Sequence, residues 1–102
     1  MDDLKKQIEA GNFAVNNGAV IRTVNILNGG WIKYDVIKTV LDFVPLRNLI
    51  YLQRAGYINV RYCKSKALIN VEDASCDDIE VTLTARGMKL TTCVITDEAV
   101  II

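Results

Sequence analysis

Five basic side chains are concentrated in a stretch of the chain that contains no acid. Residues 43–71 hold no Asp or Glu and carry a local charge of +5, from Arg47, Arg54, Arg61, Lys64 and Lys66. Guanidinium and ammonium groups gathered in this way attract polyanions, and the nucleic-acid backbone is the commonest of these. The first chemistry that the sequence indicates is therefore anion binding by the middle of the chain.

The next nine residues reverse this charge. Residues 72–80 carry −5, from Glu72, Asp73, Asp77, Asp78 and Glu80. The whole chain holds 12 basic and 12 acidic side chains and has no net charge, whereas DNA-binding domains are typically basic overall. Three interpretations of the acidic run stay open at this point: a solvated turn, a segment that repels DNA, or a surface that attracts a basic partner.

The residues typical of catalysis and of metal binding are scarce. The chain has no histidine, no Gly-rich phosphate loop and no Gly-x-Ser-x-Gly motif, and its acids cluster in a polar segment. Its three cysteines, Cys63, Cys76 and Cys93, are too widely spaced for a typical zinc site or disulfide framework. We expect most of them to be buried small apolar residues. We therefore expect a protein that is not an enzyme and that has no cofactor and no metal.

Length and hydropathy indicate one compact domain. The chain has 102 residues, 51% of them hydrophobic, which suits a single domain over residues 1–102 with one modest core. No apolar run approaches the roughly 20 residues that cross a bilayer, and the N-terminus lacks the pattern of a signal peptide. We expect a cytoplasmic protein without a membrane partner.

The helices that must position the basic residues follow from apolar spacing and turn signals. A short first helix with Leu4 and Ile8 on one side is expected to stop at Gly11, and residues 12–18 are expected to form a link because Asn16-Asn17-Gly18 is a turn signal. Apolar residues at helical spacing then predict three further helices, over residues 19–27, 31–44 and 46–55.

After Gly56 the apolar period changes from helical spacing to two. This change predicts strands over residues 57–62, 67–71 and 79–83, with a solvated turn over 72–78. A short helix follows over 84–90, and Thr84 is its expected N-cap. In the tail, residues 91–102, the apolar end Ala99-Val-Ile-Ile102 should dock on this domain or on a partner.

Two motifs in this order carry a family resemblance. Leu49-x-x-Leu52-x-x-Ala55-Gly56-Tyr57-Ile58 resembles the end of a winged-helix recognition helix that enters the first strand of the wing. Val81-Thr-Leu83-Thr84-Ala-Arg86-Gly87-Met-Lys-Leu90 resembles the signature that closes the wing in many winged-helix proteins. The match covers about residues 19–90. More narrowly, Thr84-Ala-Arg-Gly87 followed by the short tail is similar in layout to small winged-helix proteins of Mu-like transposable phages.

The resemblance implies an α+β fold, a winged helix-turn-helix. It would have a three-helix core and a small antiparallel β-wing, a short N-terminal helical extension over residues 1–16, and a C-terminal tail over 91–102. It implies that the helix over 45–55 enters the major groove of duplex DNA, as in a phage or prophage transcriptional regulator. The implied DNA-binding residues are Arg47, Asn48, Tyr51 and Arg54 on that helix, with Arg61, Lys64 and Lys66 on the wing.

The chemistry of these residues suits that role, although each has a simpler interpretation. Arginine pairs with guanine edges or phosphate, asparagine pairs with adenine, and lysine attracts phosphate of any sequence. Equally, Arg47 and Arg54 would suit a solvated helix face, Tyr51 would suit the rim of the core, and the two lysines would guard a sheet edge. A homodimer is one expectation. The alternative function is a protein–protein interaction module (an adaptor, an inhibitor or a dimerisation domain) that does not bind DNA.

Overall fold

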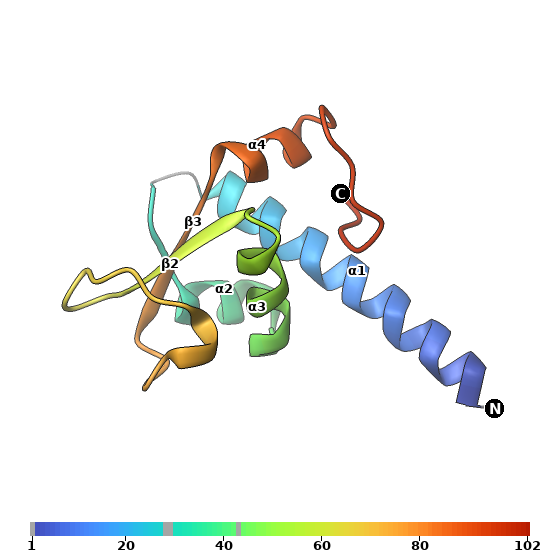
Figure 1. Ribbon diagram of the computed structural model, residues 1–102, viewed down its shortest axis with the longest axis horizontal. Helices are drawn as coiled ribbons and strands as arrows, with labels where there is room; N and C mark the ends of the chain where they lie inside the picture. Colours follow the sequence, from blue (N-terminus) through green and yellow to red (C-terminus); the bar gives the residue numbers. More distant parts are fainter. Residues whose placement is uncertain (1, 28–29, 43) are drawn as a thin grey trace.

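The computed structural model describes residues 2–27, 30–42 and 44–102 (Figure 1). Within these ranges the chain is α+β, with four α-helices and one three-stranded antiparallel sheet. The elements in chain order are α1 (Asp2–Ile26), β1 (Ile32–Lys33), α2 (Tyr34–Leu41), α3 (Leu46–Arg54), β2 (Ile58–Tyr62), the 3-10 helix η1 (Val71–Asp73), β3 (Ile79–Leu83) and α4 (Ala85–Thr91).

The first helix is longer than the sequence predicts. One continuous helix, α1, replaces the expected short helix, the link over 12–18 and the helix over 19–27. Gly11 does not stop it, because a glycine inside a helix costs only about 1 kcal/mol. The expected turn at Asn16-Asn17-Gly18 is wrong because Asn17 and Gly18 are buried in contacts with other segments. The N-terminal half of α1 projects from the body of the molecule (Figure 1).

The helix expected over residues 31–44 is shorter, and a strand takes the place of its first residues. Ile32 pairs with Val81 and Lys33 pairs with Glu80, so these two residues form the edge strand β1 and not the first helical turn. The helix α2 then ends at Leu41, and Asp42 follows with a φ of 64°, outside the helical region. Phe43, within the predicted helix, lies outside the described residues.

The sheet has the order β1-β3-β2, so the last strand in sequence lies at its centre. The paired residues Ile32, Val81 and Val60 are all buried and form one row on the core face. Because strand residues alternate between faces, the neighbouring row of Lys33, Glu80 and Arg61 lies on the opposite face.

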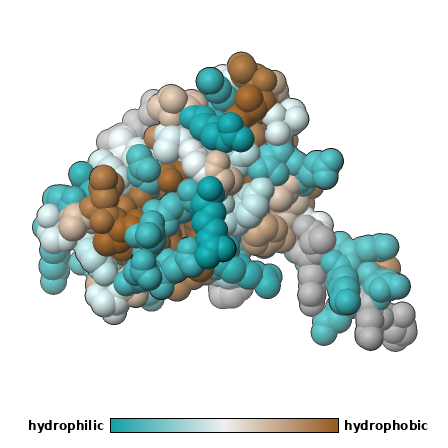
Figure 2. Space-filling view, in the orientation of Figure 1, coloured by the Kyte–Doolittle hydropathy of each residue, from teal (hydrophilic) through white to brown (hydrophobic). Residues whose placement is uncertain are grey.

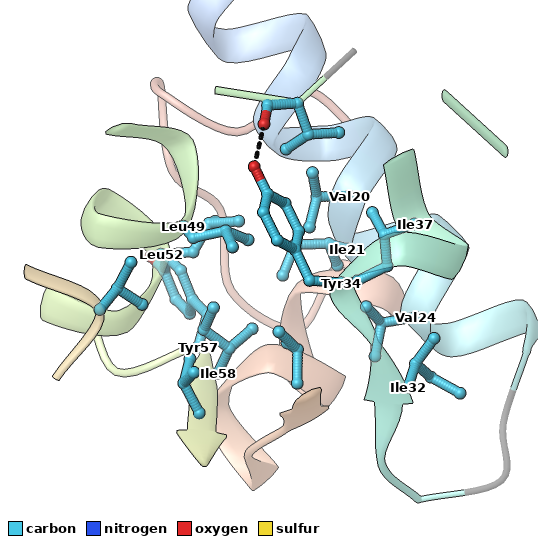
Figure 3. Packing of buried hydrophobic residues seen from close by; sticks show 14 of the residues in the cluster. Val20, Ile21, Val24, Ile32, Tyr34, Ile37, Leu49, Leu52, Tyr57 and Ile58 are labelled. Atoms are coloured by element: carbon cyan, nitrogen blue, oxygen red, sulfur yellow. Dashed lines mark hydrogen bonds between the residues drawn. The ribbon is translucent and has the colours of Figure 1, made fainter. Parts of the chain in front are cut away.

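The core lies between the C-terminal half of α1, the shorter helices and one face of the sheet. Figure 3 shows Val20, Ile21 and Val24 of α1 facing residues from α2, α3 and β2. Tyr34 reaches through this cluster, and its hydroxyl donates a hydrogen bond to the Val44 carbonyl. A buried tyrosine hydroxyl requires such a partner, and this bond ties the start of α2 to the chain after its end.

The predictions for α3, β2, β3 and α4 are confirmed to within one or two residues. Gly56 has a φ of 84° and ends α3. The Thr84 hydroxyl accepts a hydrogen bond from the Gly87 N–H at 3.1 Å and caps α4, as predicted. Gly87 itself is required by a close approach, because a Cβ there would lie 2.2 Å from the Tyr57 carbonyl oxygen.

The connection from β2 to β3 is less regular than expected. The strand predicted over 67–71 is reduced to a single bridge between Arg61 and Leu68, and Val71 begins η1 instead. The reason is that the chain turns away from β2 after Ile69 and packs η1 against α3. Figure 2 shows hydrophobic surface over this part of the molecule, where Leu68 is 70% exposed.

The tail docks on the domain, one of the two outcomes that the sequence allowed. Val100 is buried, the Ile101 N–H donates to the Ala14 carbonyl at 3.0 Å, and the Asn17 amide donates to the Ala99 carbonyl at 2.9 Å. The tail therefore lies along the middle of α1 (Figure 1). In the described part of the chain, no helix has both the length and the apolar character needed to span a membrane.

Candidate functional site

The seven residues predicted to bind DNA lie on α3, on β2 and on the β2–β3 connection, and not all of them reach the surface. Leu49 and Leu52 anchor α3 to the core, so the opposite side of the helix faces solvent. Arg47 lies on that side, and Lys64 lies on the connection. Both are exposed, and no carboxylate of the described residues forms a salt bridge with either.

Asn48 does not lie on the exposed face of α3. It is 1% exposed, and its amide donates to the Asn17 side-chain oxygen at 2.8 Å, so the predicted solvent-facing position is wrong. The sequence placed it one residue after Arg47 on a polar face, but a shift of one residue rotates a side chain by about 100° around a helix. The buried amide pair joins α1 to α3, and through Ala99 it also joins both to the tail.

Tyr51 is engaged by the tail. Its hydroxyl donates to Asp97 at 2.6 Å, and the Tyr57 hydroxyl donates to the same carboxylate oxygen at 2.7 Å. Burial, followed by the hydrogen bond to Asp97 and its negative charge, raises the pKa of Tyr51 to about 12. The Tyr51 ring also meets Phe13 edge-on, with ring centroids 5.5 Å apart. Tyr51 is thus a structural contact between α3, α1 and the tail.

Arg54 is paired with the first acid of the 72–80 run. Its Nε donates to Glu72 at 2.8 Å, and a second nitrogen contacts the other carboxylate oxygen, which makes a bidentate pair. The hydrogen bond from Arg54 holds the pKa of Glu72 below its ordinary value. The neighbouring Gln53 bonds the Ile69 carbonyl and the Val71 N–H at 2.7 and 2.8 Å, so η1 is held along the end of α3.

Arg61 and Lys66 share the last acid of the run. Glu80 accepts from Arg61 Nε at 2.6 Å and from Lys66 Nζ at 3.2 Å, and it is only 5% exposed. Burial raises the pKa of Glu80, but the hydrogen bonds from Arg61 and Lys66 outweigh burial and hold the pKa below its ordinary value. The Arg61 guanidinium also stacks on the Trp31 ring, 4.0 Å from its centroid.

Two of the five acids of the run therefore pair with the basic stretch within the same molecule. Glu72 and Glu80 hold three of the five basic side chains of residues 43–71, and Asn48 and Tyr51 are used in packing. Of the seven predicted residues, the structure leaves Arg47 and Lys64 exposed and without a salt bridge in the described ranges. The basic stretch is continuous in sequence but is not one free patch in space.

Comparison of the chain with protein-family models, with curated proteins and with solved structures gave no match.

The cysteines correct another expectation. Cys76 and Cys93 are exposed and Cys63 is half-buried, so burial is not their common feature. All three are free thiols. Over the described ranges, no group of three or more Cys, Asp or Glu side chains is arranged to hold a metal ion.

The projecting half of α1 is a surface that the sequence analysis missed. Leu4, Ile8 and Val15 are 59%, 55% and 48% exposed, and they share one face of the helix with the exposed Gly11. We call these four residues the α1 stripe. The prediction that Gly11 ends the helix concealed this stripe, although the spacing of four, three and four residues continues across that glycine.

Proposed function

We propose that this domain is a winged helix that works as a protein–protein interaction module, with the α1 stripe as its binding surface. In this proposal α1, α2 and α3 are the three-helix core, and the β2–β3 connection is the wing. The observation that carries the proposal is the projecting N-terminal half of α1, which we call the arm. Leu4 and Ile8 are more than half exposed on a helix that extends beyond the body of the domain. Large apolar side chains aligned on an unpartnered helix face are typical of protein interfaces.

The charge pattern supports the same function. Duplex DNA is bound mainly through several lysine or arginine contacts to phosphate. Here Arg54, Arg61 and Lys66 already contact carboxylates of the chain, so binding DNA through them would break or weaken existing ion pairs. A protein-binding role requires no such exchange, and it requires neither a cofactor nor catalysis.

Photo-cross-linking from the arm tests this function. A benzophenone amino acid at Gln7, beside the stripe, is expected to give covalent protein adducts when the full chain is irradiated in extract of its source cells. Ile8→Ser should remove these adducts, since it takes away apolar contact area. The control is Ile26→Ser, which changes an exposed isoleucine at the other end of the same helix. No adducts, or adducts that persist in Ile8→Ser, would contradict the proposal.

Duplex DNA binding is the second candidate, and it is favoured by Arg47 and Lys64. These side chains are exposed, carry no salt bridge among the described residues, and lie on the α3 and wing elements that a winged helix offers to DNA. In this candidate the protein is a phage or prophage transcriptional regulator, as the family resemblance implies. Glu72 would then limit affinity by holding Arg54.

Fluorescence anisotropy with a labelled duplex at low salt tests this candidate. If it holds, the double variant Arg47→Ala and Lys64→Ala weakens binding and lowers the salt dependence by about two counterions. Glu72→Gln should tighten binding severalfold, because it releases Arg54 for phosphate. Glu98→Gln, an exposed acid of the tail, is the charge-matched control. Absence of salt-dependent binding, or equal tightening by both acid variants, would refute a site at this surface.

A further inference from the structure

The α1 stripe belongs to a longer row on the same helix. Leu4, Ile8, Gly11, Val15 and Gly18 are separated by four, three, four and three residues, the spacing by which paired helices meet. The row contains large apolar residues and glycines, so it presents both projections and gaps. The first four of these residues are exposed, and Gly18 is buried.

The two glycines of the row differ in what covers them. A Cβ at Gly18 would lie 1.6 Å from the Ile101 carbonyl oxygen, so the tail lies directly on the helix there. A Cβ at Gly11 would have nothing within 4 Å among the described residues beyond its own neighbours in the helix. The molecule thus uses one glycine of the row to seat its own chain and leaves the other, two helical turns earlier, open between Ile8 and Val15.

We propose that Gly11 seats Ile8 of a second copy of this chain, in an antiparallel pair of α1 helices. This inference rests on the proposed function and names its partner. A twofold axis between positions 9 and 10 places Ile8 opposite Gly11 and Leu4 opposite Val15 in both directions. Each large side chain then meets a smaller one or a gap, so the row is complementary to itself. Ile101, half exposed beside Gly18, lies next to the incoming Leu4 and extends the apolar contact.

The antiparallel order is favoured over a parallel one. A parallel pair in register would set Gly11 against Gly11 and leave a gap. It would also place the globular parts of the two copies at the same end of the paired helices. In the antiparallel pair the exposed amides Gln7 and Asn12 lie opposite each other at the flank, so no like charges meet there. The paired length of about 18 Å is short. We therefore expect an interface below the roughly 800 Å² per partner of stable complexes, and a dissociation constant in the micromolar range.

Sedimentation velocity on the purified full chain, from about 1 to 500 μM, tests the second copy. The expected result is a reversible shift from monomer to dimer across the range. Ile8→Ser should raise the dimer dissociation constant at least about tenfold, because the substitution removes the packed Ile8 side chain from both copies of the symmetric dimer. Ile26→Ser should leave it unchanged. A monomer at every concentration would overturn the inference.

Gly11→Leu distinguishes specific packing at Gly11 from non-specific apolar association. Leucine fills the gap without opposing the helix, since its helix propensity exceeds that of glycine. A specific Gly11 seat predicts weaker dimerisation in Gly11→Leu, whereas non-specific apolar association predicts stronger dimerisation, because the exposed apolar area increases. Stronger association would therefore overturn the proposed geometry even if the wild-type chain dimerises.

Orientation is tested by disulfide trapping, with the three native cysteines replaced by serine. A mixture of Ile8→Cys and Gly11→Cys chains should form disulfide-linked heterodimers faster than either chain links to itself. Faster linking within Gly11→Cys alone would indicate a parallel pair and overturn the proposal. Failure of the second copy is distinguishable from failure of the proposed function. Arm adducts to another protein, with a purified chain that stays monomeric, would refute only the dimer.

Discussion

Replacing Gly18 with alanine is expected to detach the C-terminal tail and to lower the free energy of unfolding by about 2–4 kcal/mol. The added methyl would occupy the place of the Ile101 carbonyl oxygen, 1.6 Å away, so one of the two backbones must move. Detaching the tail exposes Val100, which is 5% exposed, and breaks the bond from the Ile101 N–H to the Ala14 carbonyl. Chemical denaturation followed by circular dichroism measures the difference.

Gly11→Ala is the matched control, because it makes the same change in the same helix. Among the described residues, alanine at position 11 meets no atom within 4 Å outside its own stretch of helix, so the effect expected in the monomer is helix propensity. We expect this variant to be more stable by about 0.5–1 kcal/mol. Both variants are compared at low protein concentration, where self-association is absent. Equal changes in the two variants would contradict the role of Gly18 as the seat of the tail.

Local signals were sufficient to predict α3, β2, β3 and α4. Gly56 ends α3 because only a positive φ fits there, and Thr84 caps α4 through a bond to a residue three positions on. The sequences of β2 and β3 alternate apolar and polar residues, the period of two that predicts a strand. Each of these features is decided within a few residues of sequence.

The errors in the N-terminal third arise from contacts between distant segments. Asn17 and Gly18 have the composition of a turn, but they bind Asn48 and Ile101, which are 31 and 83 positions away in the chain. Those contacts favour a helix more strongly than local propensity opposes it. Likewise Ile32 has helical spacing, and its pairing with Val81 makes it a strand residue. Such outcomes require the tertiary structure.

The candidate site shows the same division. The charge reversal at residues 71 and 72 is a property of the sequence. How much positive surface it leaves free depends on which basic side chains pair with which acidic ones in the fold. The antiparallel register of β2 and β3 sets Arg61 opposite Glu80, and the packing of η1 on α3 brings Glu72 to Arg54. In a stretch that looked like a free basic surface, three of the five basic side chains are thereby held in ion pairs. The arm at the other end of the molecule then becomes the more accessible surface.

Asp97→Ala is expected to loosen the tail at a second contact, before Val100 and Ile101. It should lower the free energy of unfolding by about 2–3 kcal/mol. The carboxylate accepts hydrogen bonds from Tyr51, Tyr57 and the Ala99 N–H, so truncation leaves two tyrosine hydroxyls and one backbone donor without their acceptor. Asp97→Asn retains an acceptor but loses the charge, and we expect about half that effect. Near-ultraviolet titration should show the pKa of Tyr51 falling from about 12 in both variants, since one of its causes is removed.

The stability that Asp97 provides should also depend on pH in a defined direction. Burial raises the pKa of Asp97, but the bonds from Tyr51 and Tyr57 outweigh burial and hold the pKa below its ordinary value near 4. A carboxyl whose pKa is lower in the folded state stabilises the fold above its ordinary pKa and loses that contribution as pH falls through the lowered value. The wild type should therefore lose stability below about pH 4 more steeply than Asp97→Asn. Plotted against pH, the free energies of unfolding of the wild type and Asp97→Asn should converge at the lowest pH values. A constant difference from pH 7 to pH 2, or the same change of slope in the exposed neighbour variant Glu98→Gln, would show that Asp97 does not hold the tail through its charge.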